Sequence, residues 1–244
     1  MATSFKVISL SAVMALLGAC SSGNDSPADG AAPPPPSTPT RGTLIQNPPP
    51  RTASVSSAEL LAALSSSSLG QQLLQFVTAP DCGVDVHQLQ YNTVDAIGQP
   101  TTASGAMMIP TGSDGACQGP RPIVVYAHGT QVERAFNIAN ITAADSAEGL
   151  LIAVVFASQG YIVVAPNYAG FDTSTLPYHP FLNADQQSKD TADSLTAARS
   201  ALPTSFAPSV TDSGKLFVTG YSQGGFVAMA THRLLQASGA TVTA

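Results

Sequence analysis

The chain has 244 residues, and 44% of them are hydrophobic, which is enough for one large domain with a buried core. Its formal net charge is −6, and its 9 Lys and Arg residues form no basic cluster. This pattern excludes the electrostatic footprint of a nucleic-acid-binding protein. The sequence also has no glycine-rich phosphate loop, so no cofactor is indicated.

An export signal is predicted at the N-terminus. Lys6 precedes an apolar stretch over residues 7–17, which is too short to span a bilayer. Small residues then precede Cys20, an arrangement that resembles a bacterial lipoprotein signal. The resemblance implies a signal peptide over residues 1–19, a diacylglycerol anchor on Cys20 and, because Ser21 follows, an outer-membrane or cell-surface location. The alternative is an ordinary cleaved signal with a coincidental cysteine.

Residues 20–55 are expected to form a disordered tether, because this segment is rich in proline and serine and has few bulky apolar residues. The folded domain is predicted over residues 56–244. Ser56 and Glu59 at its start have the spacing of a helix capping box.

Cys82 and Cys117 remain once Cys20 carries lipid. In an exported protein such a pair most simply indicates one disulfide. Residues 84–94 and 101–109 look like two antiparallel strands, and the bridge is expected to clip this hairpin. A metal site is not indicated, because two cysteines without paired histidines cannot supply the four ligands of zinc.

Apolar runs alternate in type after the hairpin. Strand-like runs at 123–127, 161–166 and 216–219 are separated by helical patterns at 144–157 and 184–201. This β-α-β-α-β order predicts an α/β fold, with a mostly parallel sheet and crossover helices after the antiparallel N-terminal hairpin.

Residues 220–224 read Gly-Tyr-Ser-Gln-Gly, which is typical of a nucleophile elbow. In this motif a strand turns sharply into a helix, and glycines at the outer positions, here Gly220 and Gly224, leave room for the strained turn. A β-favouring run precedes Ser222 and a helical pattern follows it, so Ser222 is predicted to be a nucleophile. The alternative is that Ser222 only caps the helix.

His128 and Gly129 follow the buried strand at 123–127. In hydrolases with such an elbow, the oxyanion hole takes one N–H from the residue after the nucleophile and another from this upstream loop. The predicted donors are therefore Gln223 and either Thr130 or Gly129. Alternatively, the His-Gly pair simply ends the strand, with the imidazole bound to nearby backbone.

Three motifs occur in order: a strand ending in His-Gly, a strand ending in Pro-Asn-Tyr-Ala-Gly, and the elbow. Together they resemble the N-terminal part of an α/β-hydrolase. Over residues 80–244 the chain is most similar to secretory lipases and esterases, which implies large acyl-ester substrates. Some relatives have aspartate in place of Asn167, so Asn167 is given no catalytic role. In the loop that follows, Tyr178, His179 and Phe181 either contact substrate or pack within the loop.

A catalytic serine needs a histidine base and a carboxylate that orients it, and in this fold both follow the serine in the chain. No acidic residue follows Ser222, and His232 lies ten positions further along the same predicted helix, or roughly 15 Å away. His87 and His128 precede the serine. Residues 239–244 look like the start of another strand, so we expect an N-terminal portion of a longer enzyme, truncated at its C-terminus and inactive alone.

The sequence thus predicts an exported, membrane-anchored serine ester hydrolase that acts on acyl-ester small molecules or lipids through an acyl-enzyme at Ser222. A serine peptidase of prolyl-oligopeptidase type is the alternative within enzymes, because the elbow followed by Gly225 also suits that family. A surface lipoprotein that uses a hydrolase-like scaffold for binding, without catalysis, is the alternative from another class.

Overall fold

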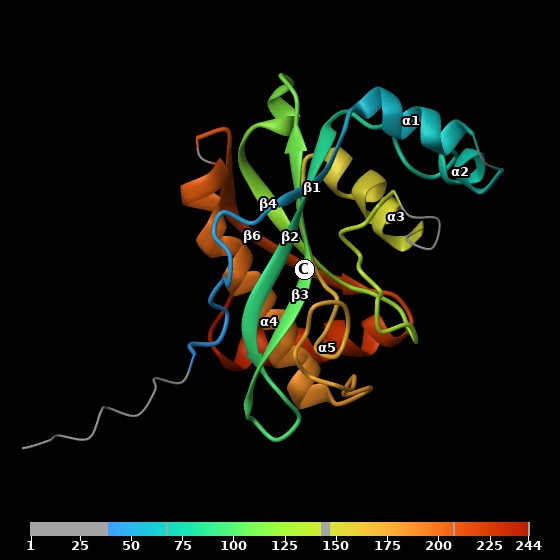
Figure 1. Ribbon diagram of the computed structural model, residues 1–244. Coiled ribbons are helices and arrows are strands. Elements are labelled where there is room, and N and C mark those ends of the chain that lie inside the picture. The colour runs from blue at the N-terminus through green and yellow to red at the C-terminus, as the bar shows by residue number, and fades with distance from the viewer. Residues whose placement is uncertain (1–38, 67, 143–146, 207, 244) are drawn as a thin grey trace, which may run out of the picture. The chain divides into compact units, whose positions relative to one another are not determined.

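The computed structural model describes residues 39–66, 68–142, 147–206 and 208–243 (Figure 1). The predicted signal peptide, the predicted lipid anchor at Cys20 and the first part of the predicted tether lie outside these residues.

Six strands form one mixed sheet in the order β1-β2-β3-β5-β4-β6. β4, β5 and β6 are parallel to one another, whereas β1, β2 and β3 pair in antiparallel fashion and β3 joins the two halves by an antiparallel pairing with β5. The predicted α/β class is confirmed, with three antiparallel strands at the start rather than two. The bounds are β1 Arg51–Val55, β2 Gly83–Val94, β3 Pro100–Thr111, β4 Gly119–Ala127, β5 Ile162–Pro166 and β6 Val210–Gly220.

Helices pack on both faces of this sheet (Figure 1). α4 and the end of α5 share a core with one face, and α1 and α3 share a core with the other. The α-helices are α1 Ser57–Ser65, α2 Ser68–Leu73, α3 Ala147–Val155, α4 Ala184–Ala201 and α5 Gln223–Ala237. The other short helical segments are η1 Gly115–Cys117, η2 Ala157–Gln159 and η3 Leu202–Phe206.

The continuous apolar run of β5 follows from its central position. Ile162 and Val164 belong to the core on the α4 side, whereas Val163 and Ala165 belong to the core on the α3 side. A strand that is covered on both faces must be apolar at successive positions, not at alternate ones. This explains why the apolar run of β5 is easy to recognise in the sequence.

The capping box at the start of α1 is confirmed. Glu59 N–H donates to Ser56 Oγ at 3.2 Å, and Ser56 N–H donates to the Glu59 carboxylate at 2.8 Å. These bonds satisfy N–H groups that the first turn of a helix otherwise leaves open.

The tether prediction is wrong for residues 39–55. Gly42 N–H donates to Asn92 O and Ile45 N–H donates to Gln90 O, each at 2.8 Å, and β1 then pairs with β2. Composition could not reveal this, because backbone hydrogen bonds along the outer edge of β2, rather than large apolar side chains, hold the segment. The folded domain therefore begins earlier than predicted.

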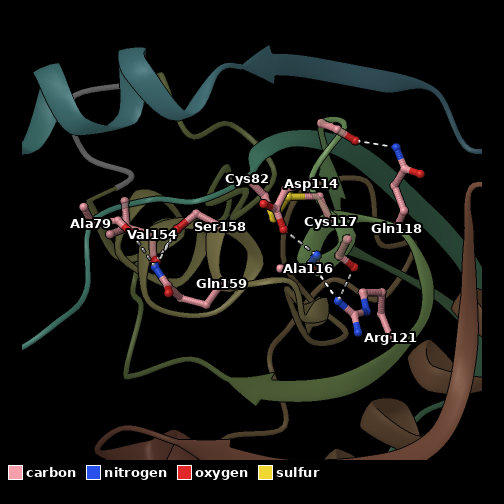
Figure 2. Close-up of a disulfide and its surroundings, with 12 residues drawn as sticks. Ala79, Cys82, Asp114, Ala116, Cys117, Gln118, Arg121, Val154, Ser158 and Gln159 are labelled. Atoms are coloured by element: carbon pink, nitrogen blue, oxygen red, sulfur yellow. Dashed lines mark hydrogen bonds between the residues drawn. A yellow bond between two sulfur atoms is a disulfide. The ribbon is translucent and has the colours of Figure 1, made fainter.

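Cys82 and Cys117 form a disulfide, as predicted (Figure 2). Their Cα atoms are 5.6 Å apart, although 35 positions separate them in the sequence. Cys82 immediately precedes β2, and Cys117 lies in η1 just after β3. The bridge therefore closes the hairpin at the end opposite its turn. Arg121, also drawn in Figure 2, donates to the carbonyl oxygens of Gly115 and Ala116 beside the bridge.

The strand predicted after the elbow helix is wrong for residues 239–243. Ala240 N–H donates to Leu235 O at 2.9 Å, which caps α5 and turns the chain back toward the sheet. Thr243 N–H then donates to Leu216 O in β6 at 2.6 Å. One backbone bond does not make a ladder, so this segment lies beside β6 without becoming a strand.

Candidate active site

Ser222 lies on the tight turn between β6 and α5. Its φ of 53° and ψ of −119° fall outside the regions that residues other than glycine prefer. Its side chain is exposed and makes no capping hydrogen bond to α5, which argues against a role as a simple helix cap. The hydroxyl is thus presented to solvent at a helix N-terminus, where the helix dipole favours negative charge.

Gly220 and Gly224 let this turn approach the end of β4. A Cβ atom on Gly224 would collide with Ala127 O, and one on Gly220 would collide with Gly224 O. A side chain at either position would push the elbow away from β4. The glycine spacing of the motif therefore has a steric cause in this fold.

The loop after β4 lies against the elbow. A Cβ atom built on Gly224 would come within 2.7 Å of His128 O, and one built on Gly129 would come within 3.1 Å of Tyr221 Cδ1. The fold therefore brings the two predicted motifs together where the parallel strands β4 and β6 end, the edge at which open α/β sheets bind ligands.

The backbone N–H groups at this junction differ in availability. Gly129 N–H donates to Glu148 Oε1 on α3 at 3.0 Å, and the same oxygen accepts from the Tyr126 hydroxyl at 2.7 Å. Within the described part of the chain, the N–H groups of Thr130 and Gln223 have no hydrogen-bond partner. Two of the three predicted donors are therefore open, whereas Gly129 is occupied.

His128 is buried, and its side chain stabilises the loop after β4. Its Nδ1 lies 2.6 Å from Gly129 O, its Nε2 lies 3.1 Å from Asn167 O, and its ring stacks on Tyr168 with centroids 4.2 Å apart. Burial lowers the pKa of His128. Both ring nitrogens face backbone oxygens, so the imidazole is not oriented to act as a base for Ser222.

The Asn167 side chain also has a structural role. Its Nδ2 donates to Ser104 Oγ at 2.9 Å, and its Oδ1 accepts from Ile138 N–H at 2.8 Å. These bonds tie β3, β5 and the segment before α3 together, which agrees with leaving Asn167 out of the catalytic set.

Among the described residues, no histidine hydrogen-bonds to Ser222. His87 lies in β2 with its Nδ1 3.0 Å from Pro49 O, and His179 bonds to amide side chains. His232 lies on α5, roughly 15 Å along the helix from the serine. The described residues thus contain the strand-to-helix turn at Ser222 and the His-Gly loop beside it, but no histidine placed to act as a base for Ser222.

The loop between β5 and α4 reaches the elbow. Arg134 holds the loop by donating to three of its backbone carbonyl oxygens at 2.8 to 2.9 Å. Tyr178 and Phe181 are about half exposed, whereas His179 is partly buried with its Nε2 2.8 Å from Gln223 Nε2. Sequence reasoning placed the loop near the site but missed this contact, because no spacing rule links residues 44 positions apart.

A cavity of about 580 Å³ opens along β6, but Ser222, Gln223 and Thr130 do not line it. Its walls are mostly apolar, and they include Val124, Phe156, Tyr161, Phe217, His232 and Val242. Across the described ranges, no three His, Cys, Asp or Glu side chains are grouped so that they could hold a metal ion. Of the helices described, none is long and apolar enough to cross a membrane.

The chain is similar to proteins that are named as hydrolases. Residues 150–236 match the prolyl oligopeptidase family. The rice cell wall degrading esterase LipA from Xanthomonas oryzae is 36% identical, with a TM-score of 0.69 over 82% of this chain and 47% of LipA. A candidate hydrolase from Legionella pneumophila, 24% identical, shares the fold with a TM-score of 0.68 over 82% of this chain and 50% of its own. No curated protein sequence matches significantly.

The chain therefore spans about half the length of the solved structures it matches. Within this length the chain contains the mixed sheet with its parallel strands and the strand-to-helix turn at Ser222. The motif order, the strand topology and the likeness to LipA agree: the chain belongs to the α/β-hydrolase superfamily, in its esterase- and lipase-like part.

Proposed function

We propose that the protein is a serine ester hydrolase of the lipase or esterase type, with Ser222 as its nucleophile. The observation that carries the proposal is the φ of 53° at Ser222, on a turn packed against the end of β4. Such a backbone costs about 1 to 3 kcal/mol and clusters at functional sites. The similarity to LipA, which is named as an esterase, supports an ester substrate.

Ser222 Oγ attacks the acyl carbonyl while a histidine takes its proton. The C–O bond to the alcohol breaks as the histidine returns that proton, and water then releases the acid from the acyl-enzyme. The N–H groups of Gln223 and Thr130 stabilise the oxyanion. Thr130 is preferred to Gly129, because Glu148 already accepts the Gly129 N–H. No described residue supplies the base and its carboxylate, so we assign them to sequence of the longer protein.

The match of residues 150–236 to the prolyl oligopeptidase family favours a second candidate, peptide hydrolysis. The elbow and its helix suit both reactions, since only the leaving group differs, an alcohol in one and an amine in the other.

Substrate panels separate the two candidates. The protein from its complete reading frame is offered p-nitrophenyl esters of increasing acyl length and, separately, proline-containing peptide amides. We expect ester hydrolysis that falls about 10³-fold or more in Ser222→Ala. Ser238→Ala, at the far end of α5, serves as the matched control and should keep full activity. Preferential cleavage of the amides supports the peptidase, and no cleavage of either class supports a non-catalytic binding protein.

We also propose that the protein is exported through residues 1–19 and held at the outer membrane or cell surface by lipid on Cys20. The disulfide between Cys82 and Cys117 supports export, because such bonds persist in oxidising compartments. An anchored enzyme of this kind would meet acyl-ester small molecules or lipids outside the cytoplasm.

A further inference from the structure

His179 connects the loop between β5 and α4 to the first residue of the elbow helix. Its Nε2 lies 2.8 Å from Gln223 Nε2 and 3.3 Å from Gln187 Nε2, while its Nδ1 lies 3.1 Å from Ala169 O. One imidazole thus joins three separate segments of the chain.

These partners determine the tautomer of His179. Because the Ala169 carbonyl can only accept, Nδ1 must carry the proton, and Nε2 then offers its lone pair to the amide N–H groups of Gln223 and Gln187. Burial lowers the pKa of His179, against the opposing effect of the hydrogen bond to Ala169, and this direction favours the neutral ring with a free lone pair.

The other side of His179 is anchored in the core. Ala169 N–H donates to Asp190 Oδ2 at 2.6 Å, and Asp190 Oδ1 accepts from the Tyr91 hydroxyl at 2.8 Å. Tyr91 and Asp190 are fully buried, on β2 and α4 respectively. Hydrogen bonds to the backbone N–H and the backbone C=O of Ala169 therefore connect the centre of the domain to His179, and His179 in turn contacts Gln223.

Gln223 needs such an anchor. It follows the strained Ser222, and as the first residue of α5 its N–H has no partner inside the helix. Gln223 is only 5% exposed, so a bond that fixes its side-chain amide also restrains the backbone to which it is attached. Without the hydrogen bond between Gln223 and His179, fewer contacts restrain the strained turn at Ser222.

We propose that His179 is a positioning residue: by accepting a hydrogen bond from Gln223, it holds the Gln223 N–H toward the oxyanion that forms during attack by Ser222. This inference rests on the proposed function. It assigns His179 no contact with substrate and no proton transfer.

Two variants test the hydrogen bond between His179 and Gln223, each by replacing one of the two partners. His179→Phe keeps an aromatic ring beside Phe171, whose centroid is 4.6 Å from that of His179, but removes both nitrogens. Gln223→Met keeps the length of the side chain but cannot donate. In the full-length protein we measure the rate of fluorophosphonate reaction at Ser222, together with kcat and KM for a p-nitrophenyl ester. His232→Phe, on α5 ten positions after Ser222, is the matched control.

Each single variant is expected to lower the labelling rate and kcat about tenfold, because a misaligned oxyanion-hole donor loses part of the 10²- to 10³-fold that complete removal costs. KM should stay unchanged, and the double variant should be no slower than the slower single variant. The control should react like the wild type.

Multiplicative losses in the double variant, a rise in KM alone, or labelling of His179→Phe at the wild-type rate would each overturn the inference while leaving the proposed function intact. A wild-type protein that is not labelled at Ser222 overturns the proposed function and this inference with it. If His179→Phe does not fold, Gln223→Met decides: a tenfold loss with an unchanged unfolding midpoint supports the bond, and no loss overturns it.

Discussion

At the scale of single residues, Gly224 is where the backbone of the elbow meets the end of β4. A Cβ atom there would overlap Ala127 O, which belongs to a buried strand and cannot move aside. We therefore expect Gly224→Ala to lower the free energy of unfolding by about 1 to 3 kcal/mol, the usual cost of overpacking, and to lower the reactivity of Ser222. Urea unfolding and ester hydrolysis measure the two effects.

Gly115→Ala is the matched control for this prediction. A Cβ atom on Gly115, in η1, meets no atom within 4 Å. Its free energy of unfolding should stay within about 0.5 kcal/mol of the wild type, as surface substitutions usually do. Equal losses in the two variants would mean that the added methyl group acts through helix or backbone preference and not through the contact with β4.

Asp190 makes stability depend on pH. Burial raises the pKa of its carboxyl group from 3.8 to about 7. Because the folded pKa lies above the unfolded one, the stabilisation by the protonated group is complete below the unfolded pKa and is lost as the pH rises through about 7, by at most about 1.4 kcal/mol per pH unit. Asp190→Asn should flatten this part of the curve of unfolding free energy against pH.

The difference between the two curves reports the titration of Asp190 together with its coupling to Asp193. Burial also raises the pKa of Asp193, and the charge of Asp193 contributes to the raised pKa of Asp190. Curves for wild type and Asp190→Asn that run parallel from about pH 4 to about pH 8 would show that Asp190 does not titrate in this range.

At the scale of elements, hydrophobic periodicity predicted the helices and strands whose burial, on one face or on both, determines which positions are apolar. α4 spans Ala184–Ala201 as predicted, because its pattern is long and regular. β6 begins at Val210 instead of residue 216, since its polar first half is held by pairing with β4 and not by apolar side chains. β1 was missed for a related reason: it is an edge strand of mostly small side chains, and its partner residues in β2 lie 29 to 36 positions further along the chain.

Prediction of the candidate site has the same limit: the sequence reveals local motifs but not contacts between elements that are distant in the chain. The elbow and the His-Gly loop are local motifs, so the sequence alone could predict Ser222, Gln223 and either Thr130 or Gly129 as site residues. The bond between Gly129 and Glu148 and the bond between His179 and Gln223 join different elements, so only the fold reveals them.

The disulfide supports the hairpin of β2 and β3 at its open end. On the loop-entropy model, a bridge between residues 35 positions apart stabilises the fold by about 3 to 4 kcal/mol. Replacing Cys82 and Cys117 together by alanine should lower the free energy of unfolding by that amount, measured by urea unfolding under oxidising conditions. Under reducing conditions the wild type should fall to the level of the variant, and a wild type insensitive to reductant would contradict this role.

At the scale of the whole molecule, the proposed anchor decides where the enzyme acts. Acyl chains on Cys20 add about 0.8 kcal/mol of membrane affinity per buried CH₂ group, enough for a firm anchor when several chains are attached. In cells fed a labelled fatty acid, the wild type should carry the label and sediment with membranes. Cys20→Ala should carry no label and appear in the soluble fraction, whereas a Cys20→Ala protein that remains labelled would contradict lipid attachment at this residue.

The central claim is that Ser222 is a nucleophile in a preorganised elbow, and covalent labelling tests it most directly. The full-length protein is treated with a fluorophosphonate, digested, and mapped by mass spectrometry. We predict one adduct, on Ser222, that is absent from Ser222→Ala and from protein unfolded before treatment. An unlabelled Ser222 in the folded protein, or an adduct that persists in Ser222→Ala, would contradict the account.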